Sequence, residues 1–378
     1  MIVSVLVLSL FIVGTICLLH SIELACIVFM VTIAIPLADM LVSLIRVKTP
    51  LKIQTPDGSN EPFHPSVLFF EKGWNGFSYW MAFTPYPINK APYRDRWECP
   101  CIVASNDGIH WQYPAEVKFL DDLTQSQIQE RDYFSDTHLT YDSDRNVLYC
   151  YYRLDEGEEP KKVTIFRRES ADGKRWSERT SLIYSEAVDA LEPLSQSIVY
   201  KDSSFSMWYV AHSVDPNGVY RLHSKDGITW GENKKCIFLN AQVTPWHIDC
   251  QYIDGAYYMT IYELSQRITL WKSLDGEYFT FVKVLLTIPV FGNCGLFYNN
   301  ILYRACMVKD QKEYKVYFAC GNKKRNTIGL MTGREISRLK VSSTAKRSDV
   351  GLLAYDMLSK YSAVERFVFH KIKKIGKR

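Results

Sequence analysis

The hydrophobic pattern divides the chain into an apolar N-terminal segment and a longer segment of short, alternating runs. In the first segment, residues 2–19 and 24–45 are nearly uncharged apolar runs, separated only by residues 20–23. At about 1.5 Å per residue, each run is long enough to cross a bilayer as a helix. The pattern predicts a membrane anchor over residues 1–48, made of one or two transmembrane helices. A single long buried or signal-anchor helix is the alternative.

Charges beside the apolar runs predict how this anchor is oriented. Arg46, Lys48 and Lys52 follow the second run directly, whereas the other end offers only the α-amino group. The positive-inside rule then places the large domain in the cytoplasm. We therefore expect a membrane-anchored protein whose large domain is cytoplasmic.

The C-terminal segment, residues 346–378, has a helical pattern followed by a basic tail. Apolar residues recur at helical spacing, at Leu353, Met357, Tyr361, Val364 and Val368. The tail HKIKKIGKR is basic enough to lie on an anionic leaflet, with a solvated end as the alternative. The segment predicts a C-terminal helix and a basic tail.

Between residues 60 and 345 the pattern changes to short strand-like runs rich in aromatic residues, such as HPSVLFF, SDTHLTYD and PWHIDCQYID. A turn motif, Ser-x-Asp-Gly-x-x-aromatic, recurs among these runs, with its aspartates at Asp107, Asp172, Asp226 and Asp275. Asp-Gly between strands indicates a hairpin, because Gly adopts the positive φ of the turn and the Asp carboxylate accepts backbone N–H bonds. Such regular recurrence is typical of repeat architectures.

Five units fit this segment, the fifth being GNCGLFYNN followed by ILYRACMV and EYKVYFACG. Several antiparallel strands per unit, repeated around an axis, form a β-propeller. The predicted fold class is all-β: a five-bladed β-propeller over residues 60–345, preceded by a transmembrane helix or hairpin and followed by a C-terminal helix. A β-sandwich with repeated turns is the alternative.

Composition adds limits on partners and metals. The net charge of +4 is too small to indicate a nucleic-acid partner, while an aromatic content of 14% supplies both strand formers and residues that stack on sugars. The ten cysteines show no spacing of a paired metal site, since one residue separates Cys99 from Cys101 where two are usual. Free buried thiols in a reducing compartment are the simplest interpretation.

Alignment of the first strands brings polar residues into register. The shared apolar positions are Val67, Leu139, Ile198, Cys250 and Leu296. Three places earlier stand His64, Asp136, Ser195, His247 and Asn293. One place earlier stand Ser66, His138, Ser197, Asp249 and Gly295. Because side chains alternate along a strand, both sets face away from the apolar set and converge on the channel of a propeller.

These units resemble the five-bladed β-propeller glycosidases, the superfamily that includes glycoside hydrolase family 43. The resemblance covers roughly residues 60–345 and rests on the blade order, the Ser-x-Asp-Gly-x-x-Trp turns and the strand openings quoted above. It implies a glycan partner and acidic residues on the first three blades: an Asp as general base, an orienting Asp and a Glu as general acid. The second-blade Asp resembles Asp136, and the third-blade Glu resembles Glu192 of LEPLSQS. His64 stands where the first-blade Asp is expected.

The departure at His64 leaves the catalytic roles open. An inverting glycosidase needs one carboxylic acid and one base on opposite faces of the sugar. His64 is one candidate base, because an unperturbed pKa of about 6.5 suits proton abstraction at neutral pH. Asp249 is the other candidate base, with His247 as the acid or as an orienting partner.

Four further residues are candidates for substrate binding: His138, Arg153, Trp246 and Arg304. Both arginines follow a tyrosine in their strands and can hold a sugar hydroxyl or carboxylate by forked hydrogen bonds. Ion pairs between blades are the alternative for the arginines. Trp246 can stack on a sugar ring.

The predicted function is that of a glycoside hydrolase-like, carbohydrate-active protein at the membrane, acting on a cell-surface or capsular-type glycan through an axial pocket. No cofactor is required, although an axial cation facing His247 or Asn293 is compatible with the resemblance. One alternative is a non-hydrolytic glycan-binding or accessory module in surface polysaccharide assembly, which the cytoplasmic orientation favours. Another is a glycosyl transferase, for which we find no Gly-rich phosphate loop.

Overall fold

The computed structural model of the protein describes residues 10, 13–14, 22–45, 48–116, 118–157, 162–186, 193–211, 217–293 and 296–342. The chain separates into two compact units. One unit comprises Pro50–Thr287 and Asn300–Ser342, and the other comprises Met1–Thr49, Ile288–Asn299 and Ser343–Arg378.

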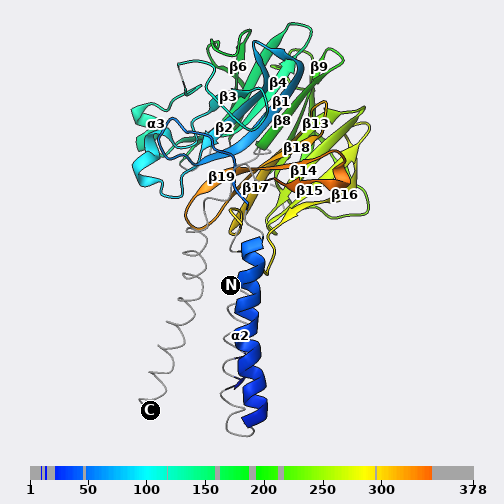
Figure 1. Cartoon of the computed structure of the whole chain (residues 1–378). Helices are drawn as coiled ribbons and strands as arrows, with labels where there is room; N and C mark the ends of the chain where they lie inside the picture. The colour runs from blue at the N-terminus through cyan, green and yellow to red at the C-terminus, as the bar shows by residue number, and fades with distance from the viewer. Residues whose placement is uncertain are drawn as a thin grey trace. The chain divides into compact units, whose positions relative to one another are not determined.

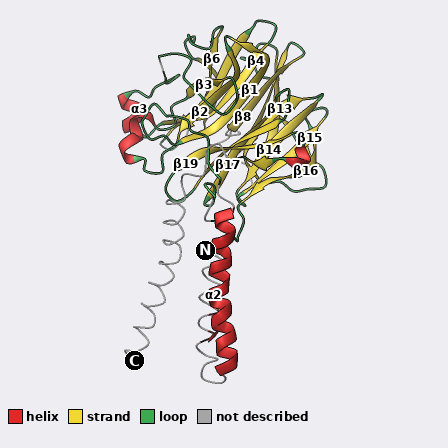
Figure 2. Ribbon diagram, in the orientation of Figure 1, coloured by secondary structure: helices red, strands yellow, loops and turns green. Residues whose placement is uncertain are grey.

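The larger unit consists almost entirely of β-strands (Figures 1 and 2), arranged in five sheets that follow one another along the chain. The first sheet is β1 (Pro62–Trp74), β2 (Phe77–Pro85) and β3 (Cys101–Ser105). The second is β4 (Tyr133–Asp142), β5 (Val147–Glu156), β6 (Lys162–Ser170) and β7 (Thr180–Glu186). The third is β8 (Pro193–Lys201), β9 (Ser204–Ala211), β10 (Gly218–Ser224) and β11 (Lys234–Lys235).

The fourth and fifth sheets complete the set. The fourth is β12 (Ile237–Phe238), β13 (Pro245–Ile253), β14 (Ala256–Glu263), β15 (Arg267–Ser273) and β16 (Tyr278–Thr287). The fifth is β17 (Ile301–Lys309), β18 (Tyr314–Gly321), β19 (Asn326–Gly333) and β20 (Lys340–Val341). Short helical segments lie between strands: η1 (Ala91–Arg96), α3 (Gln125–Gln129) and η2 (Ile336–Arg338).

The innermost strands of the sheets close a ring. β1 packs against β4, β4 against β8, β8 against β13, β13 against β17, and β17 against β1. The ring closes between the fifth blade and the first, where the Val67 N–H donates a hydrogen bond to Cys306 Sγ at 3.2 Å. The five-bladed β-propeller predicted from the sequence is confirmed.

Apolar side chains fill the spaces between neighbouring blades. Met81 and Phe83 of the first blade pack with Cys306, Tyr317 and Ile328 of the fifth in one buried cluster. The cysteines of the described propeller strands and loops are free and buried, as the sequence predicted. Burial of this kind is the main favourable term in forming the ring.

The Ser-x-Asp-Gly motif forms the predicted turns. In the first blade, the N–H of Gly108 donates to Ser105 Oγ at 2.9 Å. The N–H groups of Ile109 and His110 donate to Asp107 Oδ1 at 2.8 Å each. The same bonds recur around Asp172, Asp226 and Asp275.

Each of these turns also joins its blade to the preceding blade. Gly173 has a φ of +71°, and a Cβ at this position would lie only 2.1 Å from Cη2 of Trp80 in the first blade. The ring closes in the same way, because the Tyr317 hydroxyl of the fifth blade donates to the Gly108 carbonyl at 3.0 Å. Gly227 meets Tyr151, and Gly276 meets Trp208. The repeated motif therefore connects blades as well as strands, which explains why it recurs.

The predicted position of the fifth inner strand was wrong. The sequence pattern predicted this strand at GNCGLFYNN, with its apolar position at Leu296, whereas the inner strand of the fifth blade is β17. In β17, Cys306 occupies the apolar position and contacts Val67. Tyr303 therefore takes the place assigned to Asn293, and Ala305 takes the place assigned to Gly295.

The smaller unit contains α2 (Ile22–Ile45), a helix of 24 residues that covers the second predicted apolar run. Asp39 on this helix is buried, and its Oδ1 accepts a hydrogen bond from the Gly292 N–H at 2.6 Å. Among the described residues, no helix has the combined length and apolarity that a bilayer crossing requires. The first apolar run lies largely outside the described residues, and the predicted C-terminal helix and tail lie wholly outside them.

Candidate active site

Irregular starts of the inner strands direct polar side chains towards the propeller axis. His64, Asp136 and Ser195 have positive φ values of 51°, 51° and 56°, at breaks in the pairing of β1, β4 and β8. Similar breaks lie beside His247 in β13 and at Tyr303 in β17. Such bulges change the direction of a side chain, and positive φ is costly for residues other than glycine. The five blades therefore share an irregular position, which is strained in the first three, and such positions are typical of functional sites.

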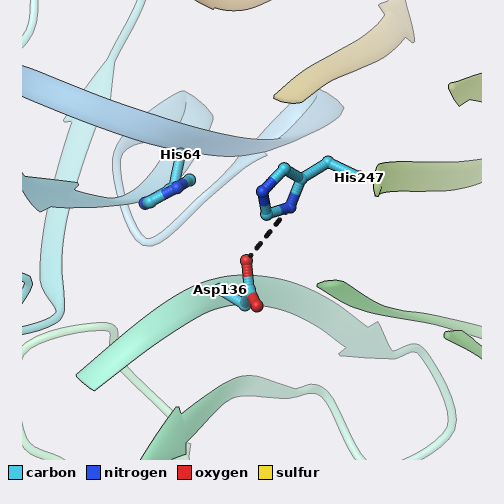
Figure 3. Close-up of side chains that lie close together, drawn as sticks. All are labelled: His64, Asp136 and His247. Carbon is cyan, nitrogen blue, oxygen red and sulfur yellow. Dashed lines mark ion pairs between the residues drawn. The ribbon is translucent and has the colours of Figure 1, made fainter. Parts of the chain in front are cut away.

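Three of these side chains meet at one point (Figure 3). His64, Asp136 and His247 come from the first, second and fourth blades and are 2%, 1% and 2% exposed. His247 Nδ1 lies 3.4 Å from Asp136 Oδ1. One nitrogen or oxygen atom from each residue lies within 4.8 Å of the others. The structure thus brings together three of the five predicted catalytic residues.

Asp136 is held in its ionised form. Arg153 Nε lies 3.4 Å from Asp136 Oδ2, and the Ser195 N–H donates to the same oxygen at 2.9 Å. Burial opposes ionisation, but Arg153 and His247 outweigh it and hold the pKa of the Asp136 carboxyl well below its usual value. Its other oxygen, Oδ1, faces His247 and has no hydrogen-bond partner among the described residues.

Both histidines of the cluster are neutral at ordinary pH. Burial lowers the pKa of His64 well below its usual value and also lowers that of His247, and the nearby Asp136 carboxylate offsets only part of the effect. His64 Nδ1 lies 2.9 Å from Thr84 Oγ1. When Nδ1 donates this bond, Nε2 keeps its lone pair. Neither ring nitrogen of His247 has a hydrogen-bond partner in the described part of the chain.

The cluster has the donor set of a divalent cation site. Two neutral imidazoles and one carboxylate are ligands that first-row divalent metals accept. The ring nitrogens of His247 and Oδ1 of Asp136 are buried without hydrogen bonds to described residues, an arrangement that calls for a bound group. The axial cation considered from the sequence therefore has candidate ligands at His64, Asp136 and His247.

Glu98 is a second carboxyl group at this point, and it was not predicted from the sequence. It follows η1 with a φ of 57°, and its Oε2 lies 3.5 Å from His64 Nδ1. Burial, and next the Asp136 charge, raise the pKa of Glu98 well above its usual value. Glu98 therefore keeps its proton at a pH where Asp136 is ionised. The surrounding WECP has no strand periodicity, so no sequence signal marked it.

The cluster opens into a cavity of about 680 Å³. Arg153 and Trp246, both predicted to bind substrate, line this cavity. Mixed aromatic and polar walls are suited to a sugar, which presents both apolar faces and hydroxyl groups. The lining residues are His64, Tyr86, Lys90, Arg94, Trp97, Glu98, Arg131, Tyr133, Ser135, Asp136, Arg153, Leu194, Trp246, His247 and Tyr303.

His138, Asp249 and Arg304 form a second buried cluster, which Arg304 joins to the first, because its Nη1 lies 3.9 Å from Asp136 Oδ1. His138 Nδ1 lies 3.3 Å from Asp249 Oδ2, and Arg304 Nη2 lies 3.7 Å from the same oxygen. Arg304 also donates to the carbonyl oxygens of Thr137 and Gln196 at 3.1 Å each. All three side chains are at most 1% exposed, and none lines the cavity. These contacts tie inner strands together.

The remaining site predictions have different outcomes. The predicted catalytic role of Asp249 and the binding roles of His138 and Arg304 stay predictions. Glu192, the predicted general acid, lies outside the described residues.

Comparison of the sequence with known proteins gives a relative that acts on an acetylated sugar. No protein-family model matches the chain. The A type blood N-acetyl-alpha-D-galactosamine deacetylase from Flavonifractor plautii is 27% identical over 231 residues, which cover 50% of this chain and 29% of that protein. The chain thus matches less than a third of the length of this relative.

Comparison with solved structures agrees with the fold. An N-acetylgalactosamine deacetylase from Flavonifractor plautii, in complex with blood group B trisaccharide, has a TM-score of 0.62 and 22% identity over 76% of this chain and 95% of that chain. The GH43_1 enzyme from Xanthomonas citri complexed with xylotriose has a TM-score of 0.54 and 9% identity, over 82% of this chain and 98% of that one. The propeller has the fold of family-43 glycoside hydrolases. The resemblance seen in the sequence is confirmed for the fold.

Proposed function

We propose that this protein removes the acetyl group from an N-acetylated amino sugar of a glycan, using a divalent cation held by His64, Asp136 and His247. The meeting of two neutral histidines and one ionised carboxylate at the cavity carries this proposal. The similarity to N-acetylgalactosamine deacetylases supports the same class of reaction. When bound, such a cation polarises a carbonyl group and lowers the pKa of water.

The protein residues fix the donor atoms of this site. Asp136 supplies the negative charge, and Arg153 together with the Ser195 N–H orients its carboxylate. The Tyr303 ring packs on His247, with ring centroids 4.2 Å apart, and so restrains the imidazole. Contacts of this kind hold ligand groups in position before a metal or substrate binds.

Glu98 supplies the proton that amide hydrolysis requires. The reaction forms a C–O bond from water, breaks the C–N bond, and releases acetate together with an amine that must gain a proton. Burial and the Asp136 charge raise the pKa of Glu98 well above its usual value, so its carboxyl group keeps a proton to donate at a pH where an ordinary glutamate has lost it. The attacking water gives up one proton to solvent, Glu98 gives its proton to the departing nitrogen, and a proton from solvent then restores the acid form of Glu98, so that the step balances.

A glycosidase is the second candidate, because two carboxyl groups that line the cavity have pKa values shifted in opposite directions. Glu98 is protonated where Asp136 is ionised, which is the division between acid and base that glycoside hydrolysis uses. In this version Glu98 protonates the leaving oxygen and Asp136 activates water. The product distinguishes the candidates, since a deacetylase releases acetate and a glycosidase releases the aglycone.

One assay compares the two candidates directly. The purified full chain is incubated with aryl glycosides of N-acetylated amino sugars and with aryl furanosides and pyranosides, and both acetate and aglycone are measured. Acetate release that a chelator abolishes and a divalent cation restores supports deacetylation. Aglycone release without acetate would replace this proposal with the glycosidase.

The earlier predictions about location and organisation remain part of the proposal. They comprise an anchor over residues 1–48, a propeller over 60–345, a C-terminal segment over 346–378, and a cytoplasmic propeller acting on a cell-surface or capsular-type glycan. The basic residues after the second apolar run support this orientation. Labelling of cysteines introduced at exposed propeller positions in intact cells tests it. A purified protein that binds glycan but forms neither product would support the accessory-module alternative.

A further inference from the structure

We propose that the cavity selects glycans that carry an oxyanion, either a carboxylate or a phosphate, beside the acetylated sugar, and that Lys90, Arg94 and Arg131 bind this group. The inference rests on the proposed function and specifies its substrate class. All three side chains line the cavity that contains His64, Asp136 and His247. One bound glycan can therefore contact both groups of residues.

The three cations come from two segments that are held together. Lys90 precedes η1 and Arg94 lies within it, while Arg131 follows α3. Arg94 Nη2 donates to the Asp132 carbonyl at 3.2 Å, which ties η1 to the segment that carries Arg131. The positive charges are thus placed together by the backbone.

Positive charge exceeds negative charge along this part of the cavity. Among the described residues, no carboxylate forms an ion pair with Lys90, Arg94 or Arg131, although ion pairs are found for Arg153 on the same wall. The lining carboxyl groups are Glu98 and Asp136. Asp136 pairs with Arg153, so that these two carboxyl groups face four cationic side chains along the wall, Arg153 and the three residues named above. An anionic group entering the cavity would therefore meet three cations that form no ion pair with a described residue.

Trp97 provides an independent indication of a ligand at the same place. Lys90 Nζ lies 3.7 Å from the centre of the Trp97 ring, and Arg94 Cζ lies 5.2 Å from it. Trp97 is 6% exposed and lines the cavity, and its indole N–H has no hydrogen-bond partner among the described residues. A buried donor without a partner is costly. An oxyanion held by the cations would offer this N–H an acceptor.

Arginine forks suit either carboxylate or phosphate, so binding must be measured with both. We would titrate the full chain by calorimetry with N-acetylgalactosamine, with its 1-phosphate, and with a disaccharide of glucuronate and N-acetylgalactosamine. The chain carries Glu98→Gln to prevent turnover. Arg94→Gln and Arg131→Gln are then added singly. Lys72→Gln is the matched control, because it removes one exposed positive charge at the other end of β1 from His64.

The expected result is a preference for a charged ligand over the neutral sugar of about tenfold or more, the effect of one charge-assisted hydrogen bond. Arg94→Gln and Arg131→Gln each abolish most of this preference without changing the affinity for the neutral sugar, whereas Lys72→Gln leaves both unchanged. The preference also decreases at high salt. Tighter binding of the phosphate or of the uronate identifies which oxyanion the natural glycan carries.

Equal affinity for all three ligands would overturn the inference, as would a preference that Lys72→Gln removes equally. Acetate release by the unsubstituted protein is measured on the same ligands. Acetate release without a charge preference would refute only the oxyanion inference. A charge preference without acetate release would refute only the proposed reaction.

Discussion

Asp136 Oδ1 lies 3.4 Å from His247 Nδ1, although Asp136 stands on the second blade and His247 on the fourth. The pair meets because each residue occupies the irregular start of an inner strand. Both side chains are almost fully buried. Leaving such atoms without hydrogen bonds costs about 1–3 kcal/mol each, so the arrangement is one that a bound group would complete.

Asp136→Asn tests the charge at this centre. The asparagine keeps the shape and can still accept the Ser195 N–H bond, but it lacks the negative charge that a cation requires. We expect affinity for a divalent cation, measured by calorimetry, to fall by about 10–100-fold or more, with acetate release falling in parallel.

Asp142→Asn is the matched control for this experiment. Asp142 is a buried carboxylate at the other end of β4, where its Oδ1 accepts turn N–H groups that an asparagine can also satisfy. Cation affinity should be unchanged in this variant. If Asp136→Asn bound the cation as tightly as the unsubstituted protein, Asp136 would not be a ligand of the cation.

Glu98 should impose a limit on activity at high pH. Its folded pKa is raised well above the usual value, and the proposed role uses its protonated form. The kcat/KM should therefore be constant below that pKa and decline as the pH rises through it. In Glu98→Gln, kcat/KM should fall by about 10²–10⁴-fold, and the remaining activity should lack this decline. If kcat/KM of the variant declined with pH in the same way, a group other than Glu98 would cause the loss of activity at high pH.

Gly173→Ala should destabilise the propeller by separating two blades. The added methyl group would lie 2.1 Å from Trp80, at a backbone φ of +71°. We expect a loss of about 3 kcal/mol or more in the free energy of unfolding, since both overpacking and backbone strain contribute.

Gly255→Ala separates these two contributions. Gly255 has a φ of +81°, but nothing lies within 4 Å of its added Cβ. Its loss should be about 1 kcal/mol from backbone strain alone. Similar losses in urea-induced unfolding of the two variants would show that the contact with Trp80 adds nothing.

Asp310 should make the stability of the fold dependent on pH in the acid range. Its Oδ2 accepts the Tyr79 hydroxyl at 2.6 Å and also pairs with Lys315. Burial opposes ionisation, but Lys315 and Tyr79 lower the pKa of Asp310 to about 2, below the unfolded value of about 3.9. Its stabilising contribution is therefore present above pH 4 or so and is lost as the pH falls towards 2.

The difference in urea midpoint between the natural protein and Asp310→Asn measures this contribution. That difference should be largest near neutral pH and should shrink steadily in acid. A difference that does not change with pH would show that the charge of Asp310 does not stabilise the fold.

The local signals that predicted the blades are strong because they act within a few residues. The Ser-x-Asp-Gly turns form with nearest-neighbour hydrogen bonds, and alternation along the inner strands placed His64, Asp136 and His247 on one face. The fifth blade was misassigned because GNCGLFYNN imitates a strand opening. Only contacts between distant strands, such as Cys306 with Val67, establish the correct register.

Other features of the site depend on the closed ring. Glu98 lies on an irregular segment without periodicity and reaches the axis only through the tertiary fold. His138 and Asp249 share the inward face with the cavity residues in sequence, but the structure places them in the buried cluster with Arg304. Alternation predicts which face a side chain occupies, whereas its depth along the axis follows from how the blades pack.

The most direct test of the proposed function is acetate release by the metal-stripped full chain from an N-acetylated amino-sugar glycoside, before and after addition of one equivalent of divalent cation. Acetate release by the full chain that carries His247→Ala is measured under the same two conditions. We expect no acetate release before the cation is added, release after it is added, and little release by the variant under either condition. Acetate release that is independent of the cation, or that persists in His247→Ala, would contradict the assignment of His64, Asp136 and His247 as the reaction centre.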